Sequence, residues 1–587
     1  MEIDRGPFMI LRYLGRRDWI YVIACVALVV TTVYFDLRIP EYMSEITYHI
    51  QSGSGSDIVV RDGAAMVACS LFSLVASLGA GAMTARTAAA LGRNLRRLEF
   101  ERVQSFSKQD IDEFSAASLI TRSTNDIHHI QEFTARALLI SVKAPVMAVW
   151  AIGKINSGAF EWTAVTAVAM MFLVIVIVAL MKLNFPFMRR IQWLMDGVNR
   201  STRENLEGLR VVRAYNAEGL QQGKFDRAND ELLRNNLSAV HIMAPLHPIS
   251  SSLMNFLTLA IYWIGAGIVV STSSQDAQMT LFSDMIVFTT YATQVVMSVM
   301  MLTGVFRGLP RAMVSSARIR DVIEHEPSIK DGPGVGETGE KGSVEFRDVS
   351  FSYGDGRTVI SDISFRIEPG QTFAIIGPTG SGKTSLVNLI PRMYEATSGS
   401  VMVNGHDVRE YGLNGLHSRI GYVPQSAVIF SGSVRDNVNY GEGSDQRTDD
   451  DIRRALDIAQ ASRFVDSMPE GMDSFISQHG RNVSGGQRQR VSIARAVCRD
   501  PEIYIFDDTF SALDYRTDRD LRAALRRETS GHTTIIVAQR IGTIMDADRI
   551  IVMDGGRIVG DGDHESLMVD CPLYREIAES QLSEGSE

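Results

Sequence analysis

Six long apolar runs in the first 310 residues restrict this part of the chain to membrane-spanning helices. A helix needs about 20 apolar residues to cross a bilayer. Five runs approach or exceed that length without a charge, at 19–35, 64–85, 163–181, 248–275 and 285–306, and a sixth, 137–152, contains only Lys143. The alternative, buried helices of a soluble core, is disfavoured by the length and regular spacing of the runs. We therefore predict a membrane domain over residues 1–325, with spans at 19–37, 63–86, 137–157, 161–182, 247–275 and 281–307.

The distribution of basic residues predicts how these spans are oriented. Eight Lys and Arg residues fall between the second and third spans and ten between the fourth and fifth, whereas the other connections hold only Arg38, Arg61 and Lys154. Basic connections stay on the cytoplasmic side. We expect a multi-pass protein of the plasma or inner membrane, with both termini in the cytoplasm. The two basic segments are helical by pattern, so we expect the spans that flank them to extend beyond the bilayer.

The start of the chain resembles a signal peptide, with basic residues before the first apolar run. No small-residue cleavage site follows that run, and five more runs do. We therefore expect a retained first span. A short amphipathic segment precedes that span and is expected to lie along the membrane surface. Its apolar side consists of Phe8, Ile10, Leu11 and Leu14.

The second half of the chain has the pattern of a separate α/β domain. A Gly- and Pro-containing segment, 326–343, is expected to be a flexible linker. From Val344 to the end at 587, short β-branched runs alternate with helical stretches. The net charge of −10, with no basic block, gives no indication of nucleic-acid binding.

A phosphate-binding loop lies early in this second domain. An apolar strand at 373–376 leads into the pattern G-x-x-x-x-G-K-[ST], and a helix follows. Glycines in such a loop let backbone N–H groups point at phosphate oxygens, the lysine reaches the terminal phosphates, and the hydroxyl binds Mg²⁺. The predicted ATP-binding residues are Gly377, Pro378, Thr379, Gly380, Ser381, Gly382, Lys383, Thr384 and Ser385.

Two further features complete the predicted nucleotide site. Asp507 ends a second apolar strand, 503–506, where a carboxylate can hold the Mg²⁺ shell together with Thr384. A solvated acid at a strand end is the plainer alternative. Between the two strands, Val483, Ser484, Gly485, Gly486 and Gln487 open a helix. Free N–H groups at a helix start attract anions, although as local sequence this could be an ordinary capped helix.

The sequence Ser-Gly-Gly-Gln-x-Gln-Arg from Ser484, lying between a phosphate loop and its acidic strand, resembles the signature of ATP-binding cassette (ABC) proteins. The resemblance covers nearly the whole chain. The segments 118–126 and 207–213 resemble the intracellular segments of exporter-type half-transporters, which dock on the cassettes. The resemblance implies a six-helix membrane domain of exporter type, with long cytoplasmic extensions, fused to an α/β P-loop ATPase cassette.

Several residue roles are implied by this resemblance alone. Tyr353 matches the aromatic residue that stacks on adenine, and Gln425 matches the glutamine that senses the γ-phosphate and Mg²⁺. The loop of Ser511, Ala512, Leu513 and Asp514 matches the segment that crosses between paired cassettes. In this family two cassettes pair head to tail, so that one chain's phosphate loop and the other's signature enclose each ATP. A second half-transporter is therefore the expected partner.

Two positions depart from the family pattern, and both belong to this chain's own ATP site. Asp508 stands where the family has the glutamate that polarises the attacking water, and Gln539 stands where it has histidine. Asp is one methylene shorter, and Gln cannot carry a positive charge. The signature is intact apart from Val483 in place of leucine. This combination resembles the weak-site member of a heterodimeric bacterial exporter, whose partner would supply Glu, His and a deviant signature. A slowly hydrolysing homodimer is the alternative.

The transported substrate is poorly specified by the sequence. The spans are almost free of charge, and the sixth carries Met297, Met300 and Met301 beside Tyr291 and Gln294. Soft, apolar surfaces suit amphipathic ligands, so export of small amphipathic molecules, lipids or peptides is favoured. Alternatives are an importer of exporter fold, for instance for an iron chelate, and a non-transporting ATP sensor. Lys143 either contacts substrate or extends to the membrane surface.

Overall fold

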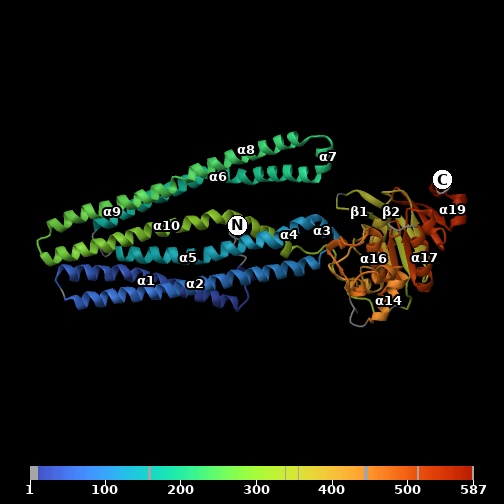
Figure 1. Ribbon diagram of the computed structural model, residues 1–587, viewed down its shortest axis with the longest axis horizontal. Helices are drawn as coiled ribbons and strands as arrows, with labels where there is room; N and C mark the ends of the chain where they lie inside the picture. Colours follow the sequence, from blue (N-terminus) through green and yellow to red (C-terminus); the bar gives the residue numbers. More distant parts are fainter. Residues whose placement is uncertain are drawn as a thin grey trace. The chain divides into compact units, whose positions relative to one another are not determined.

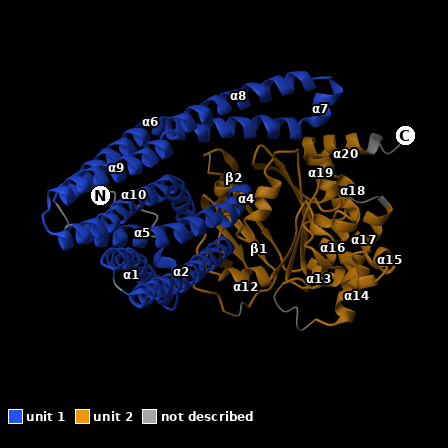
Figure 2. Ribbon diagram, turned by 60° about the vertical axis from the view of Figure 1, so that its left-hand side comes forward, with its two compact units in different colours: residues 1–104, 117–325 blue, residues 105–116, 326–587 orange. Residues whose placement is uncertain are grey.

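The computed structural model describes residues 11–53, 55–155, 160–336, 339–354, 356–441, 447–511 and 515–584. The chain divides into two compact units, Met1–Gln104 with Ala117–His325, and Ser105–Ala116 with Glu326–Glu587 (Figure 2). Phe8 and Ile10 of the expected amphipathic segment lie outside the described residues.

Long helices build the first unit (Figure 1). They are α1 (Asp18–Gln51), α2 (Ser56–Gln104), α4 (Ala116–Thr121), a π-helical turn (Arg122–Asp126), α5 (Ile127–Ile155), α6 (Phe160–Glu207), α7 (Leu209–Ala214), α8 (Glu218–Met243), α9 (Leu246–Ser271) and α10 (Gln275–Glu324). In the described residues, six of these helical stretches are long and apolar enough to cross a membrane, which confirms the predicted number of spans. Helix α2 has 49 residues, about 70 Å of helix, against about 30 Å of bilayer hydrocarbon. Its length therefore matches a span with a long extension.

Apolar packing holds the helices of this unit together at its centre. Side chains from α1, α5, α6, α9 and α10 form one buried cluster, in which the rings of Trp162 and Phe288 lie 5.2 Å apart. Helix α5 packs along α10, and α1 packs along α2. The apolar side chains of Met171, Phe172 and Ile175 on α6 are instead exposed. An apolar outer face on a long helix is what lipid contact requires.

The sequence 105–116, between α2 and α4, belongs to the second unit. It contains α3 (Lys108–Phe114), which begins with a capping box formed by Ser107 and Asp110. Asp112 accepts a hydrogen bond from Tyr394 Oη at 3.1 Å, and Asp110 accepts one from the Ser328 backbone. These contacts fix α3 on the second unit.

The segment 326–342 differs from the flexible linker that its composition predicted. In its described part, Ile329 is buried and the Gly332 and Gly334 N–H groups donate to carbonyls of residues 411 and 410. The Asp331 carboxylate accepts a hydrogen bond from the Leu413 N–H. These hydrogen bonds and the burial of Ile329 attach this described part of the segment to the rest of the second unit.

Two main sheets form the second unit. A six-stranded sheet has the order β12-β11-β3-β10-β9-β6, parallel except for its edge strand β12, and a four-stranded antiparallel sheet has the order β2-β1-β4-β5. The strands are β1 (Val344–Ser352), β2 (Thr358–Ile367), β3 (Thr372–Ile376), β4 (Ser398–Val403), β5 (His406–Asp407), β6 (Ile420–Val423), β9 (Ile503–Asp507), β10 (Thr533–Val537), β11 (Arg549–Asp554) and β12 (Arg557–Gly562), with a short pair β7 (Gly432–Ser433) and β8 (Phe475–Ile476).

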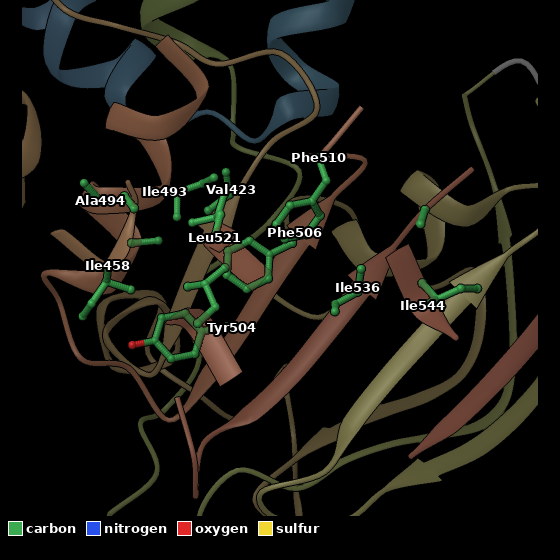
Figure 3. Packing of buried hydrophobic residues seen from close by; sticks show 14 of the residues in the cluster. Val423, Ile458, Ile493, Ala494, Tyr504, Phe506, Phe510, Leu521, Ile536 and Ile544 are labelled. Carbon is green, nitrogen blue, oxygen red and sulfur yellow. The ribbon is translucent and has the colours of Figure 1, made fainter. Parts of the chain in front are cut away.

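Helices cover the parallel sheet. They are α11 (Lys383–Asn388), α12 (Leu413–Ser418), α13 (Val434–Val438), α14 (Asp449–Ile458), α15 (Ser462–Asp466), α16 (Gly485–Val497), α17 (Tyr515–Glu528), α18 (Ile541–Ile544), α19 (His564–Asp570) and α20 (Pro572–Glu584). Figure 3 shows Tyr504 and Phe506 of β9 packing toward Ile493 of α16 and Leu521 of α17. Burial on both faces explains the continuous apolar runs of these strands.

Candidate functional site

The phosphate loop connects β3 to α11 at the centre of the parallel sheet. Its glycines are required by geometry: Gly380 and Gly382 have φ of 85° and 95°, and a Cβ on Gly377 would lie 2.0 Å from the Met553 carbonyl oxygen. Only glycine adopts such conformations at low cost. The strand, loop and helix predicted from the motif are all present, and the loop opens α11 at its N-terminus, where backbone N–H groups favour anions.

Lys383 is buried inside this loop. Its Nζ donates to the carbonyl oxygens of Gly377 at 2.7 Å and Pro378 at 2.8 Å. Burial lowers the pKa of Lys383, although the charges of Asp508 and Asp507 oppose that shift. The ammonium therefore lies within the loop, where backbone carbonyl oxygens accept its hydrogen bonds.

The end of β9 supplies the oxygen ligands predicted for a cation. Asp507 Oδ1 accepts a hydrogen bond from Thr384 Oγ1 at 2.9 Å, and Asp507 Oδ2 lies 3.4 Å from Tyr422 Oη. Burial raises the pKa of Asp507, an effect that the Thr384 hydrogen bond partly offsets. One carboxylate and one hydroxyl fit Mg²⁺, which takes few protein ligands and completes its shell with phosphate oxygens and water.

Three residues expected to act in hydrolysis meet at a single carboxylate oxygen. Gln425 Nε2 donates to Asp508 Oδ2 at 3.0 Å, and Gln539 Nε2 donates to the same atom at 2.9 Å. These residues come from the loop after β6, the end of β9 and the loop after β10. Parallel strands bring their carboxyl ends to one edge of a sheet. The structure therefore places both departures from the family pattern side by side, which their separation in sequence did not reveal.

Tyr353, the expected adenine contact, is partly exposed beside α11. Its Oη forms a hydrogen bond of 2.8 Å with Ser385 Oγ. The rings of Phe351 and Tyr394 contact it edge-on at 4.8 and 5.3 Å. These two T-shaped contacts hold the ring, which stays partly exposed.

The signature lies at the N-terminus of α16, where Ser484 and Gln487 form a capping box: the Gln487 N–H donates to Ser484 Oγ, and the Ser484 N–H donates to Gln487 Oε1. Val483 is buried under this turn. An added Cβ on Gly485 would meet no atom within 4 Å. In the described residues no hydrogen bond joins the signature to the phosphate loop.

The crossing loop can be described only at its first residue. Ser511 Oγ donates to the Asp508 carbonyl at 2.9 Å. Ala512, Leu513 and Asp514 lie outside the described residues.

Sequence reasoning missed two polar residues. Tyr422 donates to Asn388 and contacts Asp507, a partner 85 residues away in sequence. In the membrane unit, Asp36 lies 3.4 Å from Lys143 and accepts a hydrogen bond from Ser73. Lys143, left open between substrate contact and extension to the surface, thus has a carboxylate partner. The sequence feature that could have indicated this pair was Asp36, an acidic residue at the end of an apolar run.

The aromatic and methionine side chains expected in the sixth span lie in different surroundings. Tyr291 is buried and donates to the Leu37 carbonyl at 2.8 Å, so it serves helix packing. Met297 is exposed, whereas Met300 and Met301 pack against the central apolar cluster.

Comparisons with known proteins agree with the motifs and the fold. Residues 360–511 match the family model described as ABC transporter, and residues 21–299 match that of the ABC transporter transmembrane region. An uncharacterized ABC transporter ATP-binding protein of Mycobacterium tuberculosis is 40% identical over 552 residues, 93% of each chain. An ATP-dependent lipid A-core flippase of Burkholderia thailandensis is 29% identical over 583 residues, 97% of this chain and 96% of the flippase.

The fold also matches a solved structure, that of a bacterial Atm1-family ABC exporter with ATP bound. The TM-score is 0.81 at 23% identity, over 97% of this chain and 98% of that one. With both family models matched in one chain and relatives of nearly the same length, this protein belongs to the ABC transporter family, as a subunit that fuses the transmembrane region to the ATP-binding cassette.

Proposed function

We propose that this chain is one half of a heterodimeric exporter and that its own ATP site turns over slowly. ATP binding and ATP-driven transport follow from its family. The observation that carries the proposal is the combination, in one cassette, of an intact signature helix with a short carboxylate, Asp508, bonded to the two amides of Gln425 and Gln539.

This arrangement is poorly suited to activating water. A general base must reach the proton it removes, and Asp508 is one methylene shorter than the family's glutamate. A displacement on the order of 1 Å can cost about 10²-fold in rate. One of its oxygens already accepts two hydrogen bonds. Gln539 can donate to a phosphate oxygen but cannot supply an imidazolium charge in the transition state.

Binding is supported more strongly than hydrolysis. The hydrogen bonds of the phosphate loop, Lys383, Tyr353 and the Thr384–Asp507 pair support ATP binding here. Mg²⁺ fits that pair and, when bound, would neutralise charge on the β- and γ-phosphates. The described residues contain no group of three or more His, Cys, Asp or Glu able to hold a metal ion. Cation binding should therefore require nucleotide.

The competent site then lies between this chain's signature and a second chain's phosphate loop. That second chain should have six spans and a cassette with Glu and His at the positions matching Asp508 and Gln539. Its signature faces the slow site, so it has less need of an intact Ser-Gly-Gly-Gln. The distribution of basic residues supports a cytoplasmic location for both cassettes and all termini. The membrane would be the plasma or inner membrane.

The proposed substrates are amphipathic small molecules, lipids or peptides. The relative from B. thailandensis is a lipid A-core flippase by name, and the spans here are apolar and carry the ion pair Lys143–Asp36. The test uses inside-out vesicles that contain both chains, with ATP outside and a panel of amphiphiles. Export predicts ATP-dependent uptake into the vesicles. Uptake only in right-side-out vesicles that are loaded with ATP would indicate an importer, and binding of ATP without transport would indicate a regulator.

Nucleotide trapping tests the slow site in the same preparation. After several turnovers, nucleotide trapped at the two sites should be unequally distributed, with intact ATP at the site of this chain's phosphate loop. Equal turnover at both sites would rule the slow site out.

A further inference from the structure

One face of α5 and one face of α10 enclose a cavity of about 380 Å³, within the range of small-ligand pockets. His129, Glu132 and Arg136 recur along α5 at intervals of three or four residues, as do Arg307 and Arg311 on α10. Such spacing puts side chains on a single helix face. All of the lining residues belong to the first unit.

The cavity has an excess of positive charge. Arg136, Arg307 and Arg311 line it, against one carboxylate, Glu132. The ion pair recorded for Glu132 is with His128, outside the lining. Arg311 donates to the His129 ring nitrogen, which therefore carries no proton on that atom. Across the described ranges, none of the three arginines forms an ion pair, so their guanidinium groups have no anionic partner.

Glycine creates the space between these charges. An added Cβ at Gly304 would meet no atom within 4 Å, and one at Gly308 would lie 3.3 Å from the Phe133 ring. The cavity is therefore open at Gly304 and bounded by an aromatic ring near Gly308. Val305 and Ala312 add buried apolar surface to the same lining. A ligand here meets cationic groups and apolar groups together.

By the expected bounds of the spans, the cavity lies at the level where the membrane meets water. Arg136 immediately precedes the span expected at 137–157, and Arg307 ends the span expected at 281–307. Lipid headgroups occupy this level. Basic pockets between spans on the cytoplasmic side bind anionic headgroups, and the planar guanidinium group forms paired hydrogen bonds with phosphate oxygens.

We infer that this cavity binds the phosphate headgroup of an anionic amphiphile, whose chains extend along the apolar spans. The inference rests on the proposed function, because it names the substrate class that enters from the cytoplasmic leaflet. Arg136 and Arg307 contact the phosphate, while Arg311, bonded to His129, is held in position beside it.

The test measures binding without nucleotide, on the full chain purified with any partner subunit in an uncharged detergent. Dioctanoyl phosphatidic acid, dioctanoylglycerol and inorganic phosphate are titrated separately, and bound ligand is counted by native mass spectrometry. Phosphatidic acid should bind more tightly than either other probe. Arg136→Gln and Arg307→Gln should each raise its Kd about tenfold or more, the range for a lost hydrogen bond to a charged group.

Matched variants separate the cavity from general charge and folding effects. Arg189→Gln removes an exposed arginine from α6, outside the cavity, and should leave the Kd unchanged. Gly304→Leu fills the cavity without changing charge and should abolish binding, whereas Gly267→Leu, at another open position in α9, should not.

Three results would overturn the inference: equal binding of dioctanoylglycerol, equal binding of inorganic phosphate, or an equal effect of Arg189→Gln. Transport in vesicles decides the proposed function separately. If phosphatidic acid binds but no transport is seen in vesicles, the result would count against the exporter and would leave the assignment of the cavity unchanged.

Discussion

Asp508 has a φ of 44°, a left-handed conformation uncommon outside glycine. Three hydrogen bonds fix this turn: the Asp508 N–H donates to the Val537 carbonyl, and the carboxylate accepts from Gln425 and Gln539. Such backbone strain costs about 1–3 kcal/mol and persists only where its surroundings enforce it. The carboxylate is thus held in one place, so the length of the side chain decides how close it comes to an attacking water.

Lengthening this side chain and restoring a cationic partner should speed the slow site. We expect Asp508→Glu with Gln539→His to raise its turnover by about 10²-fold, since both distance and charge are corrected. The measurement is the rate at which ATP trapped at this chain's phosphate loop is hydrolysed. Asp508→Glu with Gln539→Asn is the control, because it restores reach without charge. An unchanged rate in the first variant would show that these residues do not limit hydrolysis.

The signature can be tested by a substitution that the isolated chain tolerates. Gly485→Leu has free space around it in this chain, so a clash should arise only on assembly, against the nucleotide or the phosphate loop of the partner. We expect ATPase activity of the assembled transporter to fall by at least about 10²-fold, the effect of losing transition-state donors. Gly415→Leu, at an equally open position in α12, is the control. Asp508→Asn should have a much smaller effect, and the opposite ranking would reverse the assignment of the two sites.

Acidification should weaken Mg·ATP binding at this site. Burial raises the pKa of Asp507 and of Asp508 in the cassette. A raised pKa means that each carboxylate begins to take up a proton above the ordinary aspartate value of about 3.9, and the protonated form is the weaker ligand for a cation. The Kd for ATP, measured with Mg²⁺ across pH, should therefore increase as the pH falls. The increase should begin at a pH above about 3.9. ATP binding in EDTA should change less, and identical profiles with and without Mg²⁺ would contradict the role of Asp507.

At the scale of elements, local patterns were predicted well and distant contacts were not. The phosphate loop, its strand and its helix are contiguous in sequence, so the motif determined them. Six spans followed from run length alone. Lys143 and Asp36 lie 107 residues apart, and no local pattern pairs them. The segment 326–342 was expected to be flexible because of its glycine and proline content. Composition does not reveal hydrogen-bond partners distant in sequence, such as the carbonyls of residues 410 and 411.

The Lys143–Asp36 pair joins α5 to α1 inside the membrane unit. Removing one charge leaves the other unpaired in apolar surroundings, at a cost of about 3–5 kcal/mol when fully buried. Both side chains are about a quarter exposed, so we expect roughly 1–3 kcal/mol for Lys143→Met or Asp36→Asn alone. The double variant should recover most of the loss. Thermal unfolding in detergent measures this, and equal destabilisation by single and double variants would show that the pair is not coupled.

At the scale of the whole molecule, the proposed dimer would have half of each ATP site on each chain. Ser484 and Gly485 lie at an exposed helix start, and the phosphate loop lies at the end of β3. Neither is bonded to the other within the described residues. Family members of exporter fold work as pairs, and the identity of the second chain decides whether the two ATP sites are alike. If Asp508 and Gln539 slow hydrolysis as proposed, two identical chains would have two slow ATP sites.

A different polypeptide should therefore complete the transporter. We expect it to be encoded beside this chain, since two halves of one machine are best made together, and to carry Glu, His and an altered signature. Co-expression with purification through a tag on this chain alone should yield a complex of the two with higher ATPase activity than either alone. A Glu→Gln substitution in the partner should remove most of that activity, and Asp508→Asn should remove little. If this chain by itself forms a stable homodimer with brisk ATPase activity, Asp508 and Gln539 are adequate catalysts, and the hydrogen bonds between them must then orient the carboxylate toward water rather than restrain it.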